Sequence, residues 1–459
     1  MWAGGLCNVE YVVYGAVVFS VFGLSLWQAL LVIAVSNVTF LLAGLASLQG
    51  PAAGTSAFAI ARAPFGPTGA RGVSIFNWVT MVAYETEGLV LIVLAVVVLL
   101  HKAGLPGARV DAGGIHGSPG LLVGVVLVAA AAQGVLPLLG YATILKVLKA
   151  VTVPFTVLFV ILAVVALPKM HVTANHAGAG WVGLSEAFAF AISATGLGWT
   201  IQANDYSRYL PAGTPRVAVV RAVSIGSFVP ASVLMGLGAA VATAFPAAST
   251  DPISGLSQAV PGWFLVPYLL VAGIQLLAIN TLDLYSSGLT LQAVGVPISR
   301  MRAVGVDLVV SAGLTLVALL LTSVDHFINN LITLLIVWVA PWTGVYLVDW
   351  LLRRGRYEPA RLVGADLARR WQGTPGVLGG FRLAGVVSMG AGMVASALWV
   401  ATPVFTGPLA SALGTGPEGF DLSIPAGLLV GGGLYWVLAR GTVPAEAAGT
   451  GEVVVTPRL

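Results

Sequence analysis

One short segment near the middle of the chain combines an aromatic ring, amides, a carboxylate and a guanidinium at the end of an apolar stretch. It reads GLGWTIQANDYSRYLP, from Gly196 to Pro211, and it contains Trp199, Gln202 and Asp205. An aromatic ring offers a stacking face, an amide both donates and accepts hydrogen bonds, and a carboxylate accepts them. This combination beside a long apolar run is not expected in the core of a soluble protein. The segment therefore predicts one half of a transport site.

Carboxylates also occur within apolar stretches elsewhere in the chain. They are Glu10, Glu85, Glu87 and Asp283. An ionisable side chain inside hydrocarbon is costly, so each is a functional candidate by default. In a helix, Tyr84, Glu87 and Gly88 lie at i, i+3 and i+4 on one face, and Glu85 points about 100° away. We expect Glu87 to share a cavity with Tyr84; the alternative for both glutamates is a structural hydrogen bond to a neighbouring helix.

Glycines next to polar residues predict where two helices are broken. The glycines are Gly4 and Gly5, ahead of Asn8 and Glu10, and Gly196 and Gly198, ahead of Gln202 and Asn204. Breaks at corresponding points of two halves are the sequence sign of an inverted-repeat transporter, which binds substrate and ion at the freed backbone groups. For either pair alone, close helix packing is the alternative. The polar residues beside both pairs favour the breaks.

The composition places most of the chain in a membrane. Of the 459 residues, 58% are hydrophobic and 8% are charged, whereas a soluble domain has roughly 25% charged residues. A helix needs about 20 apolar residues to cross the hydrocarbon. Such stretches are centred near residues 15, 36, 86, 130, 155, 193, 231, 278, 314, 337, 392 and 431. The sequence thus predicts an all-α polytopic membrane protein with 12 transmembrane helices.

The basic residues orient this topology. Of the 21 Lys and Arg residues, all except Lys102, Arg109 and Lys169 fall on one side. Because cytoplasmic loops carry the excess of Lys and Arg, we expect both termini in the cytoplasm and a location in the plasma (inner) membrane. The net charge of +4 therefore does not indicate nucleic-acid binding. Cys7 is the single cysteine, so an internal disulfide is impossible and a thiolate metal site is not indicated.

Sequence motifs of common enzyme classes are missing. The chain contains no HExxH, no G-x-S-x-G and no Walker A lysine motif. The histidines, including the pair at positions 171 and 176, map to outer loops, where a solvated loop is favoured over a metal site. We expect no enzymatic activity, no cofactor and no obligate protein partner. A membrane enzyme is a minor alternative, without a recognisable nucleophile, base and oxyanion set.

Four stretches of the chain resemble the nucleobase:cation symporters, also called purine/cytosine permeases. They are RAPFGPTGARG at 62–72, GWTIQANDYSRYLP at 198–211, NTLDLYSSGLTLQAVG at 280–295 and APWTGVYLVDWLLRRGRY at 340–357. The resemblance implies a LeuT-type fold, in which a 5+5 inverted repeat with discontinuous helices 1 and 6 precedes two peripheral helices. It implies a ten-helix transport core at 1–350 with repeats at 1–167 and 183–350, a cytoplasmic loop at 351–380, peripheral helices at 381–440 and a cytoplasmic tail at 441–459.

The resemblance also implies a binding site. The family stacks a flat heterocycle between aromatic side chains of helices 3 and 6, which correspond here to Tyr84 and Trp199. Family members form hydrogen bonds to the polar edge of the heterocycle with side chains from helices 1, 3, 6 and 8. The corresponding positions on helices 3 and 8 are Gly88 and Asp283 in this sequence. The predicted substrate-binding set is Trp199, Tyr84, Glu87, Gly88, Gln202, Asn280, Asp283 and Asn8.

The residue types in this set favour a substrate rich in hydrogen-bond donors, because the site has acceptors in excess. We expect a small heterocycle, cytosine or a purine above all. Allantoin, a hydantoin or a thiamine-like pyrimidine suits the same aromatic pair. The runner-up is the same fold moving an amino acid or amine, although an acid-rich cavity disfavours a substrate carboxylate.

The coupling ion is expected to be a proton, with sodium as the alternative. Sodium-coupled relatives use hydroxyls of helix 8, but residues 274–279 read IQLLAI and carry no hydroxyl. A hard cation needs oxygen ligands, whereas burial favours the protonated form of a carboxyl group. The candidate coupling residues are Glu87 and Asp283 first, followed by Glu10 and Glu85.

The chain begins at Met1 and Trp2, almost at the first predicted break. Relatives have a cytoplasmic tail and a first half-helix ahead of that break. Arginine is more frequent than lysine, which suggests a GC-rich genome in which start sites are often assigned wrongly. We therefore expect an upstream extension, because a truncated chain would have an incomplete inner gate.

Overall fold

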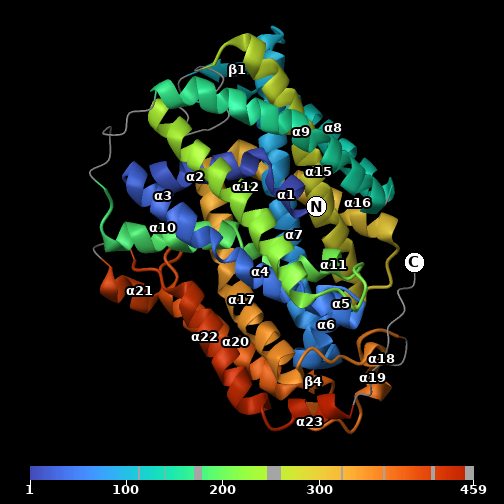
Figure 1. Ribbon diagram of the computed structural model, residues 1–459. Helices are drawn as coiled ribbons and strands as arrows, with labels where there is room; N and C mark the ends of the chain where they lie inside the picture. The colour runs from blue at the N-terminus through green and yellow to red at the C-terminus, as the bar shows by residue number, and fades with distance from the viewer. Residues whose placement is uncertain are drawn as a thin grey trace.

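The computed structural model describes residues 1–111, 114–139, 141–169, 178–245, 260–321, 324–364, 367–414 and 419–449. The histidine pair at 171 and 176 and the end of the predicted tail, 450–459, lie outside the described residues. Almost every element is helical, as the composition predicts (Figure 1).

The helices of the first half come in chain order as follows. They are α1 (Trp2–Leu6), α2 (Val9–Ser20), α3 (Leu26–Asn37), α4 (Phe40–Ala46), α5 (Gln49–Ala53), α6 (Ala57–Ile60), α7 (Arg62–Lys102), α8 (Pro119–Leu139), α9 (Tyr141–Ala166) and the 3-10 turn η1 (Leu167–Lys169). An antiparallel hairpin of β1 (Ala108–Asp111) and β2 (Gly114–Gly117) follows α7.

The second half continues in the same manner. Its helices are α10 (Trp181–Ala194), the 3-10 turn η2 (Gly198–Ile201), α11 (Ala203–Ser207), α12 (Arg216–Ala244), α15 (Gly262–Val294), α16 (Arg300–Leu321), α17 (Val324–Arg353), α18 (Pro359–Leu362), α19 (Leu367–Arg370), α20 (Leu383–Trp399), α21 (Pro408–Leu413), α22 (Ser423–Ala439) and α23 (Val443–Ala448). A second hairpin pairs β3 (Val377–Leu378) with β4 (Phe381–Arg382).

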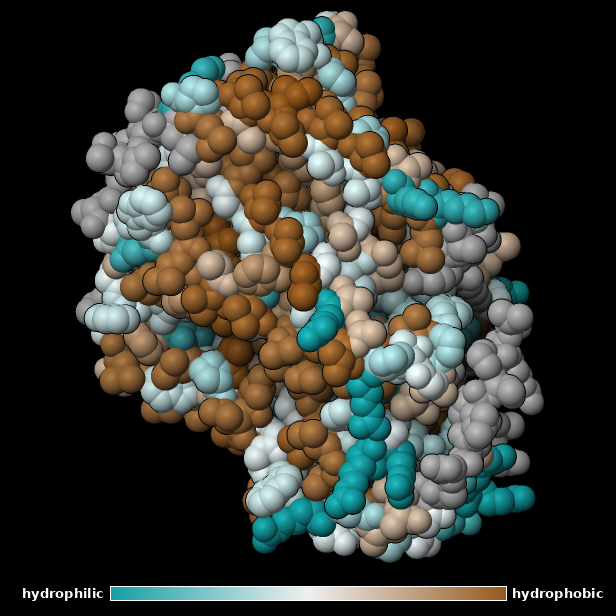
Figure 2. Space-filling view, viewed as in Figure 1, coloured by the Kyte–Doolittle hydropathy of each residue, from teal (hydrophilic) through white to brown (hydrophobic). Residues whose placement is uncertain are grey.

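A helix covers each of the predicted span centres. Within the described residues, seven helices are long and apolar enough to cross a membrane, and shorter apolar helices account for other predicted spans. Exposed apolar side chains such as Val217, Ile225 and Val233 line α12, where lipid would contact them. Figure 2 shows hydrophobic side chains over most of one face and hydrophilic ones gathered at the end where α19 and α23 lie.

Helix α7 runs through the middle of the molecule and packs most extensively against α15 (Figure 1). The 36 residues from Pro67 to Lys102, after a kink, span about 54 Å at 1.5 Å per residue. The helix is interrupted by a kink at Gly66, where φ is 75°. Residues other than glycine rarely adopt this φ. The glycine ahead of Pro67 therefore permits the bend.

The first break lies after the position predicted from glycine. Helix α1 runs through Gly4 and Gly5, and the chain leaves the helix at Cys7 and Asn8 before α2 begins. Placing the break at the two glycines was therefore wrong. Asn8 determines the position, because its side-chain oxygen caps α2 by accepting from the backbone N–H of Tyr11 at 3.3 Å.

The second break falls in the segment identified from the sequence. Helix α10 ends at Ala194, Gly196 lies in the irregular stretch that follows, and Gly198 opens the turn η2. A second irregular residue, Gln202 (φ −118°, ψ 1°), separates η2 from α11. The break thus extends over several residues and brings Trp199 and Gln202 to its inner side.

The segment after α17 and the beginning of the predicted tail pack onto the helical core. Trp371, in the predicted cytoplasmic loop 351–380, is buried, as is Arg382 just after it. In the predicted tail, Glu446 of α23 forms ion pairs with Arg353 at 3.3 Å, Arg361 at 3.4 Å and Arg382 at 2.5 Å. Paired charges and aromatic packing thus hold parts of both segments against the end of the helical core.

Candidate functional site

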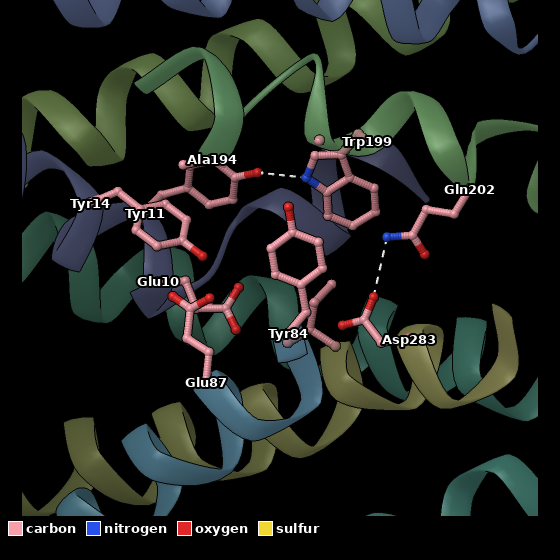
Figure 3. Close-up of a pocket in the computed structure, with 11 residues that line it drawn as sticks. Glu10, Tyr11, Tyr14, Tyr84, Glu87, Ala194, Trp199, Gln202 and Asp283 are labelled. Atoms are coloured by element: carbon pink, nitrogen blue, oxygen red, sulfur yellow. Dashed lines mark hydrogen bonds between the residues drawn. The ribbon is translucent and has the colours of Figure 1, made fainter. Parts of the chain in front are cut away.

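A small cavity lies between the two breaks, α7 and α15 (Figure 3). Its lining residues are Glu10, Tyr11, Tyr14, Tyr84, Glu87, Ala194, Gly198, Trp199, Gln202, Ile279 and Asp283. The cavity volume is about 30 Å³, which is room for roughly two or three water molecules. A planar heterocycle is larger, so it enters only if the side chains around the cavity move.

Aromatic rings form the middle of the cavity. Tyr84 of α7 and Trp199 of η2 lie next to each other there (Figure 3), and the Trp199 Nε1–H donates to the Tyr11 hydroxyl at 2.9 Å. A Cβ on Gly198 would lie 2.9 Å from the Tyr84 hydroxyl oxygen and 2.3 Å from the Ser193 carbonyl oxygen. Glycine is therefore required where the broken helix approaches Tyr84.

One end of the cavity carries two carboxylates (Figure 3). Glu10 lies in the first turn of α2, and the Asn8 side-chain amide donates to it at 3.2 Å. Glu87 extends from α7 beside the hydroxyl of Tyr14. One oxygen of Glu87 is buried and has no hydrogen-bond partner among the described residues. This oxygen can accept a proton or an N–H group of a substrate.

The opposite end pairs an acid with an amide (Figure 3). The Gln202 side-chain amide donates to Asp283 at 3.2 Å, and the Tyr206 hydroxyl donates to the Gln202 carbonyl oxygen. Asp283 comes from α15 and Gln202 from the second break. The two ends therefore differ, since Asp283 is held by a donor and Glu87 keeps an unpaired oxygen.

The structure brings five of the eight predicted substrate residues to this cavity. They are Tyr84, Glu87, Trp199, Gln202 and Asp283. Asn8 instead bridges the first break by donating to the Gly5 carbonyl oxygen at 3.1 Å. Gly88 and Asn280 lie against each other behind the cavity, because a Cβ on Gly88 would lie 2.1 Å from the Asn280 side-chain oxygen.

Of the predicted coupling carboxyls, Glu10, Glu87 and Asp283 line the cavity and Glu85 does not. A Cβ on Gly5 would meet Ile279 Cδ1 at 3.5 Å and Leu282 Cδ1 at 3.9 Å. Helix α15 thus presents aliphatic carbon to α1 just ahead of the first break. These carbons are not ligands for a hard cation.

Sequence reasoning missed Tyr11, Tyr14, Ala194 and Ile279. Tyr11 and Tyr14 stand three residues apart after Asn8, so they share a face of α2 with the spacing of helical neighbours. This pattern beside Glu10 was a usable signal. Ala194 and Ile279 carry no chemical signal, and only the packing of α10 and α15 reveals them.

The family comparison covers most of the chain. Residues 1–415 match the family described as permease for cytosine/purines, uracil, thiamine, allantoin. A curated relative, the putative purine-cytosine permease YxlA of Bacillus subtilis (strain 168), is 26% identical over 263 residues, which are 55% of this chain and 54% of the relative. The chain therefore spans about half the length of this relative.

Solved structures share the fold over nearly the whole chain. Mhp1, a nucleobase-cation-symport-1 family transporter, in a closed conformation with bromovinylhydantoin bound, has a TM-score of 0.71 at 16% identity, covering 96% of this chain and 92% of that one. Mhp1 in its inward-facing conformation has a TM-score of 0.68 at 17% identity, covering 97% and 90%. The family match over residues 1–415 and the shared helical transporter fold lead to one conclusion. The chain belongs to the family of permeases for cytosine/purines, uracil, thiamine and allantoin, and it shares the helical fold of Mhp1.

Proposed function

We propose that the protein imports a nucleobase or closely related heterocycle, cytosine or a purine above all, together with protons. The observation that carries this proposal is the cavity, where two aromatic rings lie between carboxylates at both ends. The rings suit the faces of a flat heterocycle, and stacking on an aromatic side chain contributes about 1 to 3 kcal/mol per base. The carboxylates suit its donor edge.

The polar groups favour donor-rich edges over acceptor-rich ones. Glu87 presents an unpaired acceptor oxygen, and Asp283 adds a second carboxylate at the other end. Cytosine and adenine carry an exocyclic amine that donates two hydrogen bonds, whereas the carbonyls of uracil and hydantoin only accept. A cationic pyrimidine of the thiamine type is the second candidate, because carboxylates line both ends of the cavity.

Proton coupling is supported by the groups around the first break. The cavity contains Glu10, Glu87 and Asp283, and carboxyl groups inside a membrane protein are the usual carriers of protons. The aliphatic side chains of Ile279 and Leu282 that face Gly5 give no support to a sodium site there. Sodium remains the alternative ion.

The proposed architecture places 12 transmembrane helices in a 5+5 inverted repeat with two peripheral helices. Helices α1 and α2 would form discontinuous helix 1, and α10, η2 and α11 would form discontinuous helix 6. The basic residues around α19 and β4 would face the cytoplasm, together with both termini, in the plasma membrane.

Two experiments test the function. The first compares the thermal stability of the purified protein with cytosine, adenine, hypoxanthine, uracil, allantoin, a hydantoin, thiamine and several amino acids, because a ligand that binds only the folded state raises Tm. The second measures uptake into proteoliposomes under an imposed pH gradient or an imposed sodium gradient. Stabilisation only by amino acids would overturn the substrate class, and uptake that follows sodium and ignores pH would overturn the coupling ion.

A further inference from the structure

Another cavity lies at the end of the molecule that the basic residues assign to the cytoplasm. It is bordered by the beginning of α7, the end of α15 and residues between α18 and β4. Its volume is about 710 Å³, whereas the cavity of Figure 3 has about 30 Å³. The larger volume is in the range of small-molecule pockets, which is about 300 to 1,000 Å³.

Both charged side chains in the described wall of this cavity are arginines. They are Arg62 and Arg71 of α7, and no aspartate or glutamate is among the described lining residues. Arg62 donates to the carbonyl oxygen of Leu362, whereas Arg71 has no hydrogen bond or ion pair with the described residues. Like charges that share a cavity repel each other. A negatively charged ligand would relieve this repulsion, and we call the space the basic cavity.

The surrounding protein compensates these two charges only in part. The guanidinium group of Arg71 lies against the end of α15, because a Cβ on Gly295 would meet its Nε at 3.3 Å. The carboxyl end of a helix carries roughly half a negative charge, which is less than the charge of two arginines. Glu446, the acid of α23, is already paired with three other arginines. The basic cavity therefore keeps an excess of positive charge.

The hairpin of β3 and β4 forms one wall of the basic cavity and is fixed on α7. Gly379 and Gly380 make its two-residue turn, with φ of 56° and 82°, as a type I′ turn requires. The backbone N–H of Thr68 donates to the Gly380 carbonyl oxygen at 2.9 Å, and the Thr68 hydroxyl donates to the Gly379 carbonyl oxygen at 3.2 Å. These bonds position the wall before a ligand binds, which lowers the cost of binding.

Arg71 lies where the basic cavity meets the lipid-facing surface of α7. It is exposed, and the residues at i+4 and i+8 on the same stripe are Ile75 and Val79, each 50% exposed. An arginine at the end of an apolar stripe is expected at the level of the lipid headgroups. Leu378 of β3, which also lines the cavity, is 70% exposed. Cationic groups thus stand beside an apolar rim.

We propose that the basic cavity binds the phosphate headgroup of an anionic phospholipid, with Arg62 and Arg71 as its ligands and the acyl chains along Ile75 and Val79. Phosphate oxygens accept charge-assisted hydrogen bonds from guanidinium groups, and basic pockets between helices suit such headgroups. The apolar rim favours a lipid over a soluble phosphate, which has no acyl chain to place there. In the proposed topology the lipid belongs to the inner leaflet, and its binding does not depend on which substrate or ion is transported.

The test measures the affinity of defined lipids for the detergent-purified, full-length protein by native mass spectrometry. The probes are dioleoyl phosphatidylglycerol, which is anionic, dioleoyl phosphatidylcholine, which is zwitterionic, and glycerol phosphate, which has no acyl chains. We expect the wild type to prefer phosphatidylglycerol over phosphatidylcholine at least about tenfold. Arg71→Gln should weaken phosphatidylglycerol binding at least about tenfold, because one charge-assisted contact to the phosphate is lost.

Matched variants separate this site from general attraction between basic residues and anionic lipid. Arg221 is an exposed arginine of α12, and Ile225 one turn later is 59% exposed, so Arg221 has a similar place at the lipid boundary outside the described lining of the basic cavity. Arg221→Gln should bind phosphatidylglycerol within about twofold of the wild type. Arg71→Lys keeps the charge and should retain part of the preference if Arg71→Gln folds poorly.

The remaining outcomes contradict the proposal in different ways. Equal affinity of the wild type for the two lipids would overturn the site, as would wild-type affinity for phosphatidylglycerol in Arg71→Gln. Equal losses in Arg71→Gln and Arg221→Gln would show attraction that is not specific to the basic cavity. Tighter binding of glycerol phosphate than of phosphatidylglycerol, lost in Arg71→Gln, would overturn the lipid and identify a soluble phosphate as the ligand.

Discussion

Replacing Trp199 by alanine should remove one of the two stacking faces of the cavity. Trp199 lies next to Tyr84 in the cavity wall and is fixed by the hydrogen bond from its Nε1–H to the Tyr11 hydroxyl. Losing about 1 to 3 kcal/mol of stacking weakens binding roughly 5- to 140-fold, since about 1.4 kcal/mol is tenfold in Kd. Trp199→Phe keeps a ring and loses one hydrogen bond, worth about 0.5 to 1.5 kcal/mol net, so its loss should stay within roughly tenfold.

The assay is equilibrium binding of the heterocycle that most stabilises the wild type, measured in detergent beside expression and Tm. Trp181→Ala is the matched control, because Trp181 lies at the start of α10 with 80% of its surface exposed. This control should bind as the wild type does. Wild-type affinity in Trp199→Ala would refute the aromatic sandwich and remove Trp199 from the site, whereas equal losses in Trp199→Ala and Trp181→Ala would indicate general damage.

Three further changes test other parts of the structure. Glu87→Gln should alter the pH dependence of uptake more than Trp199→Phe does, because it removes a titratable group from the cavity; identical pH profiles would exclude Glu87 from coupling. Gly88→Ala should lower Tm, at a cost of roughly 1 to 3 kcal/mol for overpacking against Asn280. The control Gly72→Ala should not lower Tm, because an added Cβ there meets nothing within 4 Å. A wild-type Tm in Gly88→Ala would show that α7 and α15 can separate at this contact. Glu446→Gln should cost on the order of 3 kcal/mol, because arginine side chains lose their partner. Burial opposes ionisation of Glu446, but the charges of Arg353 and Arg382 hold its pKa below the ordinary value. The stabilisation by the ionised carboxylate should therefore be complete above about pH 4.3 and fade as pH falls further. A Tm difference between Glu446→Gln and the wild type that persisted in acid would contradict this expectation.

The positions of the helices were predictable because the hydrocarbon imposes a length and a composition on each apolar stretch. The second break was predictable for a similar local reason, since Gly196 and Gly198 stand beside polar residues. The first break was not, because Asn8 caps α2 and determines where that helix begins. Gly4 and Gly5 remain helical ahead of it. A side chain that satisfies backbone donors outweighs the weak preference of glycine against helix.

The site was predictable to the extent that one helix face determines it. Helical spacing alone predicted that Glu87 shares a face with Tyr84 and that Glu85 points away. The cavity is lined by Tyr84 and Glu87 and not by Glu85. Gly88 shares the face of Tyr84, yet it lies against Asn280, because the absence of a side chain lets α15 approach α7 closely. The face of α15 that packs against Gly88 depends on contacts between residues nearly 200 positions apart in the chain. Local patterns do not contain this information.

The different partners of the cavity acids bear on how substrate and proton could be coupled. Gln202 donates to one oxygen of Asp283 only, so a substrate can approach the other oxygen or displace Gln202. Glu87 keeps an unpaired oxygen, so a substrate or a proton would gain a partner there without displacing one. A substrate that displaced Gln202 would act on the second break directly, because Gln202 lies between η2 and α11. In the proposed transport cycle, this displacement would couple substrate binding to rearrangement of the broken helix.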